Sequence, residues 1–241
     1  MKKLFLKNEL LFAILWIIVY VVGFSNADAV SENIGLEKSV TAAFGLLLSA
    51  VLLGFVWKNR LLSHVGLCAF QGNIRKHLYF LPLIAISSVN FVNGVQMNLA
   101  PLPSFLAVVS MLWVAFLEEV IFRGLLFKAM AKDNTKIAVI VSSVTFGMGH
   151  IVNLFLGEPL LGTLLQLIYA SAIGFLFTIL LLTGKSLLPC ILSHAFINAT
   201  SVFARSMPVA EDIAVAIVQT ILSVGYGIWL LKKNETVLKE A

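Results

Sequence analysis

The chain has 241 residues, of which 60% are hydrophobic and only 12% are charged. So few charged side chains cannot cover a water-exposed surface, so the composition excludes an ordinary soluble domain and indicates a polytopic membrane protein. The net charge of +5 does not indicate nucleic-acid binding, because the basic residues lie in short loops between apolar stretches, where they record orientation in the membrane. Cys68 and Cys190 form neither a disulfide framework nor a zinc motif, and we expect both to be packing residues.

A window of about 20 residues, the length that crosses ~30 Å of hydrocarbon, predicts eight membrane spans. They lie near residues 9–24, 39–57, 78–97, 103–128, 135–154, 159–183, 186–204 and 210–231. The stretch 59–77 is too polar to cross and predicts an amphipathic segment at the cytoplasmic interface. Because no repeat or linker interrupts the chain, we expect an all-α, polytopic membrane helix bundle formed by one integral domain, residues 1–241.

The N-terminus has a second interpretation. Lys2 and Lys3, an apolar run at 10–24 and the triplet Ala-Asp-Ala at 27–29 also resemble a cleavable signal peptide. The apolar run is long for a signal peptide, and an uncleaved first span fits the alternation of the loops. We therefore expect the first span to be retained.

The loop charges predict the orientation of the bundle. When the loops are assigned alternately to the two sides, one side receives fourteen of the 17 basic residues: Lys2, Lys3, Lys7, Lys58, Arg60, Arg75, Lys76, Lys128, Lys132, Lys136, Lys185, Lys232, Lys233 and Lys239. The other side receives Lys38 and Arg205 together with the acidic residues Asp28, Glu32, Glu37, Glu158, Glu211 and Asp212. By the positive-inside rule, both termini of this multi-pass protein are cytoplasmic, and we expect it in the cell membrane.

The fourth span carries Glu118, Glu119 and Arg123 in an otherwise apolar stretch. Such residues usually face a protein interior, where they pair, bind or react. Glu119 and Arg123 are four apart and predict an ion pair on one helix face. Glu118 points about 100° away round the helix and lacks a local partner, which favours a general base. The alternative is a structural ion pair with Glu118 as a bystander.

Two later spans add polar groups. The fifth contains Phe-Gly-Met-Gly-His at 146–150, where the histidine follows the aromatic residue by one turn and the glycines favour close approach of a neighbouring helix. The seventh places His194 and Asn198 on one face. A single membrane histidine is more often a hydrogen-bonded packing residue than a ligand. Two histidines together with two glutamates favour a site.

Depth supports one shared site. Helix rise places Glu118 ~15 Å from Lys128, His194 ~13 Å from Lys185 and His150 ~20 Å from Lys136, so the groups lie at similar levels. In a dry cavity, a carboxylate takes a proton from water, directly or with a metal, while an imidazole and a carboxamide donate to a tetrahedral oxyanion. That set suits amide hydrolysis. It could also hold zinc or relay protons.

Three patterns carry a resemblance. Glu-Glu-x-x-x-Arg at 118–123, Phe-x-x-x-His at 146–150 and His-x-x-x-Asn at 194–198 resemble the signature motifs of the CPBP intramembrane protease family, which includes type II CAAX prenyl endopeptidases and bacterial Abi proteins. The motifs occur in family order, each on its own predicted span. They define a predicted catalytic core at 104–204.

The resemblance implies a bundle of about eight transmembrane helices around a conical polar cavity that opens to the cytosol. By it, Glu118 and His150 activate water and His194 and Asn198 form the oxyanion site. It assigns structural roles to Glu119, Arg123 and Phe146. The motif does not decide whether a divalent metal such as zinc is required.

The resemblance also implies partners and roles. The expected partners are the lipid bilayer and a peptide or lipidated-protein substrate, and the family roles in bacteria are bacteriocin immunity and peptide processing. Two alternatives stay open. One is a catalytically inert family member that acts as an immunity or scaffold protein. The other is a proton- or metal-coupled transporter, although the paired broken helices expected of one are not found.

Overall fold

The computed structural model describes residues 1–70 and 80–234. Within these ranges the regular elements are helices, and the one β-type contact is an isolated bridge between Val95 and Ala204. The long helices are α2 (Glu9–Ile34), α3 (Ser39–Lys58), α6 (Pro101–Glu118), α8 (Thr135–Met148), α9 (Leu160–Gly184) and α11 (Val209–Lys233). The other elements are α1 (Lys2–Lys7), α5 (Leu81–Ser87), η2 (Val89–Phe91), η3 (Glu119–Phe127), α7 (Lys128–Ala131), η4 (Gly149–Leu156) and α10 (Leu188–Ser201).

Six helical segments of the described chain are long and apolar enough to cross a membrane. They are Glu9–Ile34, Ser39–Lys58, Pro101–Ala131, Thr135–Leu156, Leu160–Gly184 and Val209–Lys233. Their outward side chains are apolar, as at Phe105 and Ile140, which suits a surface in contact with lipid. The chain is therefore an integral membrane protein, and the expected all-α polytopic bundle is confirmed.

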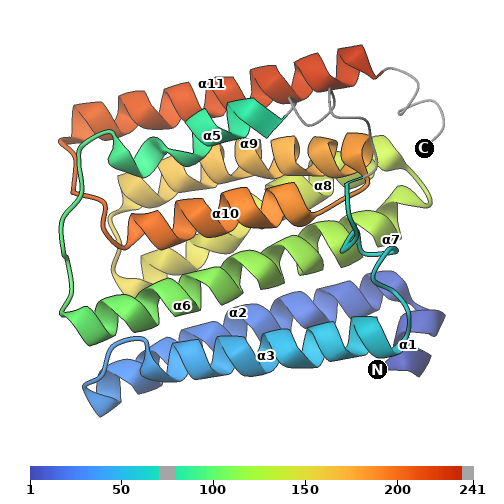
Figure 1. The fold of residues 1–241 in the computed structure, drawn as a ribbon, viewed down its shortest axis with the longest axis horizontal. Coiled ribbons are helices and arrows are strands. Elements are labelled where there is room, and N and C mark those ends of the chain that lie inside the picture. The colour runs from blue at the N-terminus through green and yellow to red at the C-terminus, as the bar shows by residue number, and fades with distance from the viewer. Residues whose placement is uncertain (71–79, 235–241) are drawn as a thin grey trace.

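Two of the eight predicted spans are not long helices. The predicted span 186–204 is α10, whose 14 residues cover about 21 Å. The predicted span 78–97 holds only the short helices α5 and η2 in its described part. Both segments nevertheless lie alongside the long helices, with α5 next to α11 and α10 next to α6 (Figure 1).

The chain after α5 does not continue as a long helix, and its asparagines bond to the end of α10. The Asn90 amide donates to the Ile197 carbonyl oxygen at 2.6 Å, and the Asn98 amide donates to the carbonyl oxygens of Val202 and Ala204 at 2.9 and 3.0 Å. The last carbonyls of a helix lack partners within it. The polar stretch after α5 satisfies carbonyls at the end of α10, and non-helical backbone is tolerated there because it is packed on protein.

The predicted interfacial segment 59–77 is described only as far as residue 70. Its described part forms turns that lie against the bundle. Val65 is fully buried, and the carbonyl oxygen of Gly66 accepts a hydrogen bond from the Leu187 backbone at 2.7 Å. Residues 71–77, like the first two residues of the predicted span 78–97, lie outside the described residues.

Local sequence signals set several helix boundaries. Asn8 and Asn134 cap the N-termini of α2 and α8, where each side-chain oxygen accepts a hydrogen bond from a backbone amide three residues on, at 2.8 and 3.0 Å. Pro101 opens α6, a position where the missing amide hydrogen costs nothing. Gly35 ends α2 in the left-handed conformation, with φ of 77°. The first helix therefore continues through the Ala-Asp-Ala triplet at 27–29.

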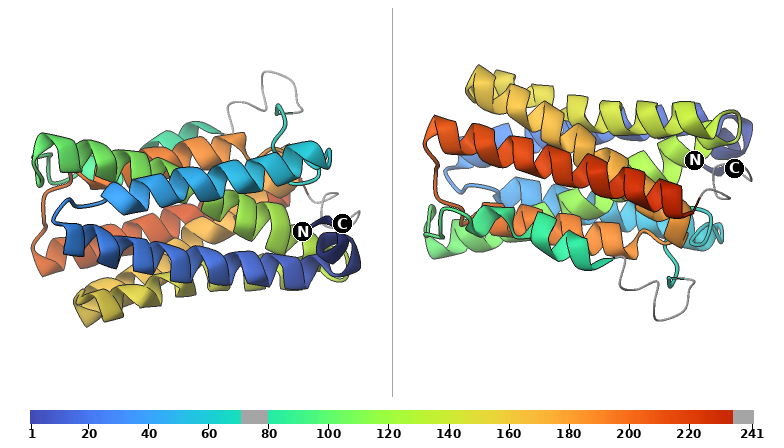
Figure 2. Two further views of the ribbon diagram at one scale, coloured as in Figure 1. Left: turned by 90° about the horizontal axis from the view of Figure 1, so that it is seen from below. Right: turned by 90° about the horizontal axis from the view of Figure 1, so that it is seen from above.

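The helices lie side by side with α6 near the middle (Figure 1). The hairpin of α2 and α3 covers one side of the bundle, and α11 covers the opposite side next to α9 (Figure 2). The helix α10 packs against α6, and α8 against α9. This arrangement surrounds the α6–η3 segment, so that every residue from Leu117 to Phe127 is buried.

The two ends of the bundle differ in charge. The chain begins at the end where α11 finishes (Figure 1). This basic end carries the predicted cytoplasmic cations that are described, from Lys2 in α1 to Lys233 in α11. The opposite, acidic end carries the connections after α2, η2, η4 and α10. One of its ion pairs joins Lys38 and Asp28 at 2.9 Å.

A glycine sets the contact between α8 and α9. A Cβ atom built on Gly147 would lie 2.6 Å from the Leu167 carbonyl oxygen and would also collide with Ser171. The predicted close approach is therefore found at Gly147. It is not found at Gly149, where a Cβ atom would meet nothing within 4 Å.

We expect Gly147→Ala to lower the free energy of unfolding by about 1–3 kcal/mol, because the added methyl group forces α8 and α9 apart. Gly149→Ala adds the same methyl group two residues away in open space and is the matched control. Thermal unfolding in detergent measures both. Equal stability of the two variants would contradict the close contact.

Candidate active site

The three motifs meet inside the bundle. Glu118 ends α6, and Glu119 and Arg123 lie in η3. His150 lies in η4, while His194 and Asn198 lie on α10. The structure thus brings together side chains from three segments that are separated by up to 80 residues in the sequence.

The first motif lies where α6 changes its backbone geometry. Residues Glu119–Phe127 form a π-helix, which continues as α7. Segments of this kind are rare and occur often at functional sites. The Ser142 hydroxyl donates to the Phe122 carbonyl oxygen at 2.9 Å and joins this segment to α8. No pattern in the sequence predicted the change from α to π geometry.

A chain of polar contacts connects the first and third motifs. Arg123 Nη1 donates to Glu119 Oε1 at 3.1 Å, as the spacing predicted. The same oxygen lies 2.9 Å from His194 Nδ1. His194 Nε2 in turn lies 3.4 Å from Glu118 Oε2. The imidazole of His194 therefore lies between two carboxylates.

This cluster has almost no access to solvent. Glu119 and Arg123 are 0% exposed, and Glu118 and His194 are 8% and 7% exposed. Buried charges persist only where partners offset the loss of water. With His194 protonated, two cations face two carboxylates and the cluster is neutral. The tautomer that donates Nδ1–H to Glu119 fixes the ring and directs Nε2 toward Glu118.

Phe146 joins the second motif to the cluster. The Arg123 guanidinium lies over its ring, 4.0 Å from the centroid, which is a cation–π contact. The ring also meets the rings of His150 and His194 edge to face, with centroids 5.8 and 5.7 Å away. Gly174 makes room here, since a Cβ atom on it would lie 3.0 Å from Arg123 Nη2.

Tyr20 of α2 is a site residue that the sequence analysis missed. Its hydroxyl donates to Glu118 Oε1 at 2.6 Å across 98 residues of chain. The helix face alone suggested that Glu118 lacks a partner. The structure shows that it has one, Tyr20, which is distant in sequence. Tyr20 is one of several aromatic residues in a hydrophobic span, so no spacing pattern in the sequence predicts its contact with Glu118. The second oxygen of Glu118 is buried and accepts no hydrogen bond within the described structure.

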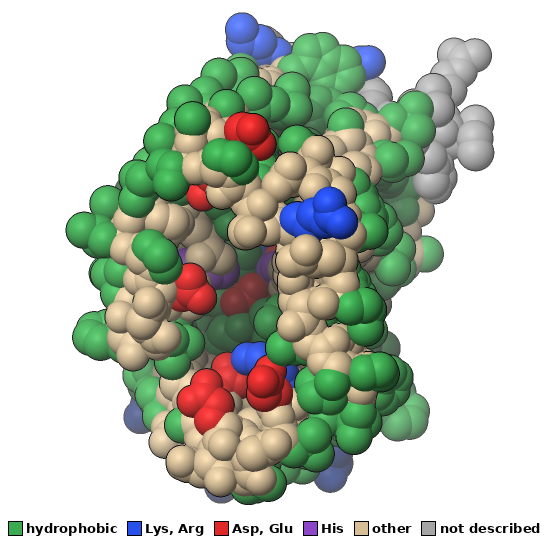
Figure 3. Space-filling view, turned by 90° about the vertical axis from the view of Figure 1, so that its left-hand side faces the viewer, with side chains coloured by type: hydrophobic (Ala, Val, Ile, Leu, Met, Phe, Trp, Pro, Cys, Tyr) green, Lys and Arg blue, Asp and Glu red, His purple; other side chains and the backbone are tan. Residues whose placement is uncertain are grey.

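A cavity of about 190 Å³ at the acidic end reaches the His194 side of the cluster, and Glu118 is not among its lining residues. His150, His194 and Asn198 line it, and so does Phe146. Its wall also holds the side-chain amides of Asn90, Gln166 and Gln219. Figure 3 views the molecule from the acidic end and shows the hollow, with acidic and histidine side chains in its depth. The described lining of this cavity therefore lies in the half of the bundle nearest the acidic end.

The donor set does not match a metal site. Among residues 1–70 and 80–234, no group of three or more His, Cys, Asp or Glu side chains is placed to hold a metal ion. Glu118 Oε1 accepts from Tyr20, and His194 Nδ1 contacts Glu119, which leaves Glu118 Oε2 and His194 Nε2 as the atoms that face each other.

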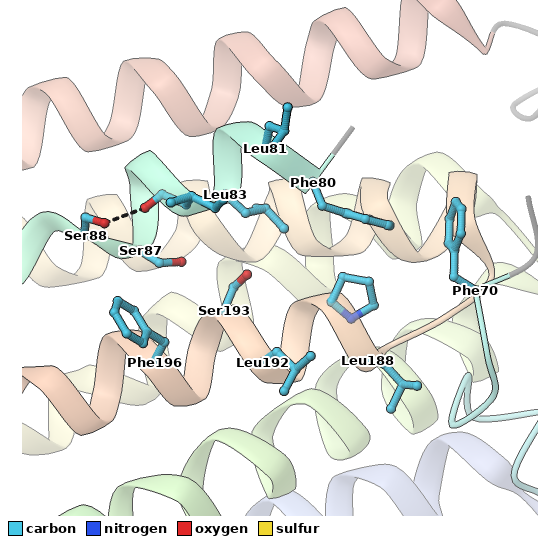
Figure 4. A pocket seen from close by; sticks show the side chains of 12 residues that line it. Phe70, Phe80, Leu81, Leu83, Ser87, Ser88, Leu188, Leu192, Ser193 and Phe196 are labelled. Atoms are coloured by element: carbon cyan, nitrogen blue, oxygen red, sulfur yellow. Dashed lines mark hydrogen bonds between the residues drawn. The ribbon is translucent and has the colours of Figure 1, made fainter. Parts of the chain in front are cut away.

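A larger groove lies on another face of α10. It has a volume of about 520 Å³, and Ser193 lies on this face while the neighbouring His194 lines the cavity. Figure 4 shows its lining between α5 and α10, mostly phenylalanine and leucine side chains with three serines. The groove holds no ionisable group among these residues, so the chemistry belongs to the smaller cavity.

Comparison with known proteins supports the same region. Residues 100–200 match the family model described as type II CAAX prenyl endopeptidase Rce1-like. The match includes all three motifs and confirms the resemblance drawn from the sequence. No significant match was found among curated proteins or solved structures.

We expect Arg123→Ala to lower the free energy of unfolding by about 3–5 kcal/mol, because it leaves Glu119 buried without its cation. Arg205→Ala, which removes an exposed arginine, is the control and should change stability by less than about 0.5 kcal/mol. Denaturant unfolding in detergent measures both. A fully stable Arg123→Ala protein would show that the buried pair does not hold the bundle together.

Proposed function

We propose that this membrane protein, which matches the type II CAAX prenyl endopeptidase family over its three motifs, is an endopeptidase that hydrolyses a peptide bond with Glu118 as general base. The family match supports a CAAX-protease-type membrane endopeptidase. The observation that carries the specific assignment is the buried Oε2 atom of Glu118, which faces His194 Nε2 at 3.4 Å. Its Oε2 atom is buried without a hydrogen bond, while Tyr20 holds Oε1 at 2.6 Å.

The proposed reaction begins with water. Glu118 accepts a proton from a water molecule in the cavity, assisted by His150, and the hydroxide adds to the carbonyl carbon of the peptide bond. The bond between carbon and nitrogen then breaks. Glu118 returns the proton to the leaving amine, so that the products are an amine and a carboxylic acid, which then loses its proton to water. The carboxylate thus acts first as base and then as acid.

The proposed oxyanion site consists of His194 and Asn198. Both side chains line the cavity. A protonated His194 Nε2 and the Asn198 amide donate to the negative oxygen of the tetrahedral intermediate, which is stabilised because the donors are already in place. Glu119 holds the His194 ring through Nδ1, and Arg123 holds Glu119. These two residues position a donor and do not touch the substrate.

The family match does not identify the substrate of this protein. A peptide or a lipidated protein in contact with the bilayer fits a site built between membrane helices. Processing and bacteriocin immunity are the two family roles that this proposal includes. The inert family member and the transporter gain no support from the family match, and the first variant below separates catalysis from both.

Glu118→Gln should abolish peptide cleavage, a loss of at least about 100-fold, because the amide keeps the shape of the side chain but cannot accept the proton. Purified protein is assayed on a prenylated CAAX peptide and on a plain hydrophobic peptide, each with and without a chelator. The melting temperature is recorded alongside to exclude unfolding. Cleavage by the Glu118→Gln protein at the rate of the parent would overturn the assignment of the base.

Tyr20→Phe should lower the cleavage rate about tenfold and shift its pH profile, because Glu118 loses a hydrogen bond to a charged group. The ring and its packing remain, so we expect little change in stability. Tyr226→Phe deletes a hydroxyl at the basic end of α11 while keeping the ring stacked on Trp229, and it is the matched control. An unchanged pH profile in Tyr20→Phe would show that Tyr20 only fills space.

A further inference from the structure

The buried face of α11 carries one large polar side chain. The buried residues of this helix are Ala216, Gln219, Ser223, Gly227 and Leu230, and all but Gln219 are small or apolar. Gln219 is only 5% exposed, and it lines the cavity that also holds the two histidines of the motifs. The helix α11 lies outside the matched residues 100–200, so no signature motif includes Gln219.

Gln219 differs from the other two amides in the cavity wall that do not belong to a motif. Asn90 donates to a carbonyl oxygen of α10 at 2.6 Å. The side-chain oxygen of Gln166 accepts a hydrogen bond from Asn153 at 2.8 Å. Gln219 forms no hydrogen bond with any residue of the described chain. Its donor and its acceptor are therefore both available to a molecule in the cavity.

A buried amide without a partner is costly, because the group has lost its hydrogen bonds to water. Such a group calls for an explanation, since nearly all buried polar groups have partners. Gln219 also borders a groove between α5 and α11, but the rest of the groove wall is apolar except for Ser88. The hydroxyl of Ser88 already donates to the Ile84 carbonyl oxygen at 2.7 Å. The partner of Gln219 is therefore expected on the cavity side.

The amide of Gln219 matches a peptide group in its chemistry. It presents an N–H donor beside a carbonyl acceptor, and a peptide group presents the same pair. The cavity also contains His150, His194 and Asn198, and its volume is about 190 Å³. This volume is smaller than the roughly 300–1,000 Å³ of pockets that enclose drug-sized ligands. A short stretch of peptide backbone in this cavity therefore lies close both to the motif residues and to Gln219.

We propose that Gln219 is a substrate-binding residue, whose side-chain amide forms hydrogen bonds with a backbone peptide group of the substrate near the scissile bond. This inference rests on the proposed function and deepens it by adding a residue of α11 that positions the peptide. Because Gln219 contacts the backbone, this subsite accepts different side chains but requires an intact peptide group.

The first test measures binding, with a fluorescently labelled hydrophobic peptide as the probe. Glu118→Gln serves as the background protein, so that the bound peptide is not cleaved. In this background, Gln219→Leu should weaken binding about tenfold, because the hydrogen bonds to the peptide group are lost. Ser223→Ala lies one turn away on the same buried face and outside the cavity wall, and it should leave the affinity unchanged. Fluorescence anisotropy in detergent measures all three proteins.

The melting temperature of each variant is recorded alongside the affinity. Gln219→Met keeps the unbranched shape of the side chain without its donor and acceptor, and it is the second variant should Gln219→Leu fail to fold. Its affinity should fall by the same factor.

The second test separates binding from a structural role. In a series of probe peptides, each backbone amide in turn is replaced by an ester, which removes one N–H donor. At the position that Gln219 contacts, the ester should weaken binding to the protein that carries glutamine but not to the Gln219→Leu protein, because that protein has already lost the interaction. A residue that only supports the fold would change the affinity for all these peptides by one common factor.

The proposal is overturned if Gln219→Leu binds the peptide as tightly as its background protein does, if every ester has the same effect in both proteins, or if no peptide binds. The assignment of the base is judged by cleavage. If the Glu118→Gln protein cleaves the peptide at the parent rate, Glu118 is not the base, and the binding measurements at 4 °C still decide the role of Gln219. The two failures are therefore distinguishable.

Discussion

Two adjacent carboxylates buried in an apolar bundle, Glu118 and Glu119, impose the constraint on which the rest of the structure depends. Neither ion is stable at this depth without partners, because the loss of hydration costs several kcal/mol per charge. Each partner comes from a defined place. Arg123 lies one turn along the same segment, His194 comes from α10, and Tyr20 comes from α2. Balancing these two charges therefore draws three parts of the chain together.

Aromatic packing around Phe146 further restricts the orientation of the charged side chains. The Phe146 ring lies against the guanidinium of Arg123 and against the imidazoles of His150 and His194. The guanidinium is thus stabilised both by the Glu119 carboxylate and by the aromatic face. The second motif thus supports the first, and both restrict the orientation of the third. A site with so few free torsions needs little reorganisation when negative charge develops on a substrate.

Much of this arrangement could be predicted from residue spacing. The helical class followed from the long apolar runs, and the pair of Glu119 and Arg123 followed from an interval of four residues. What could not be predicted depends on contacts between distant segments. The hydroxyl of Tyr20 meets Glu118 across 98 residues, and the π geometry after Glu118 has no simple pattern. The third predicted span was wrong as a single helix because asparagines such as Asn90 bond to the end of α10, a partner that hydropathy does not record.

The contact of Tyr20 with Glu118 has a consequence for how such proteins diverge. Tyr20 belongs to α2, which lies outside the matched residues 100–200. Two relatives with identical motifs would differ in the hydrogen bonding of this carboxylate if one of them carried phenylalanine at this point of α2. Exchange of the α2–α3 hairpin between relatives would transfer that difference without a change in any motif. A substitution in α2 would thus alter the hydrogen bonding of Glu118 without a change in the signature residues.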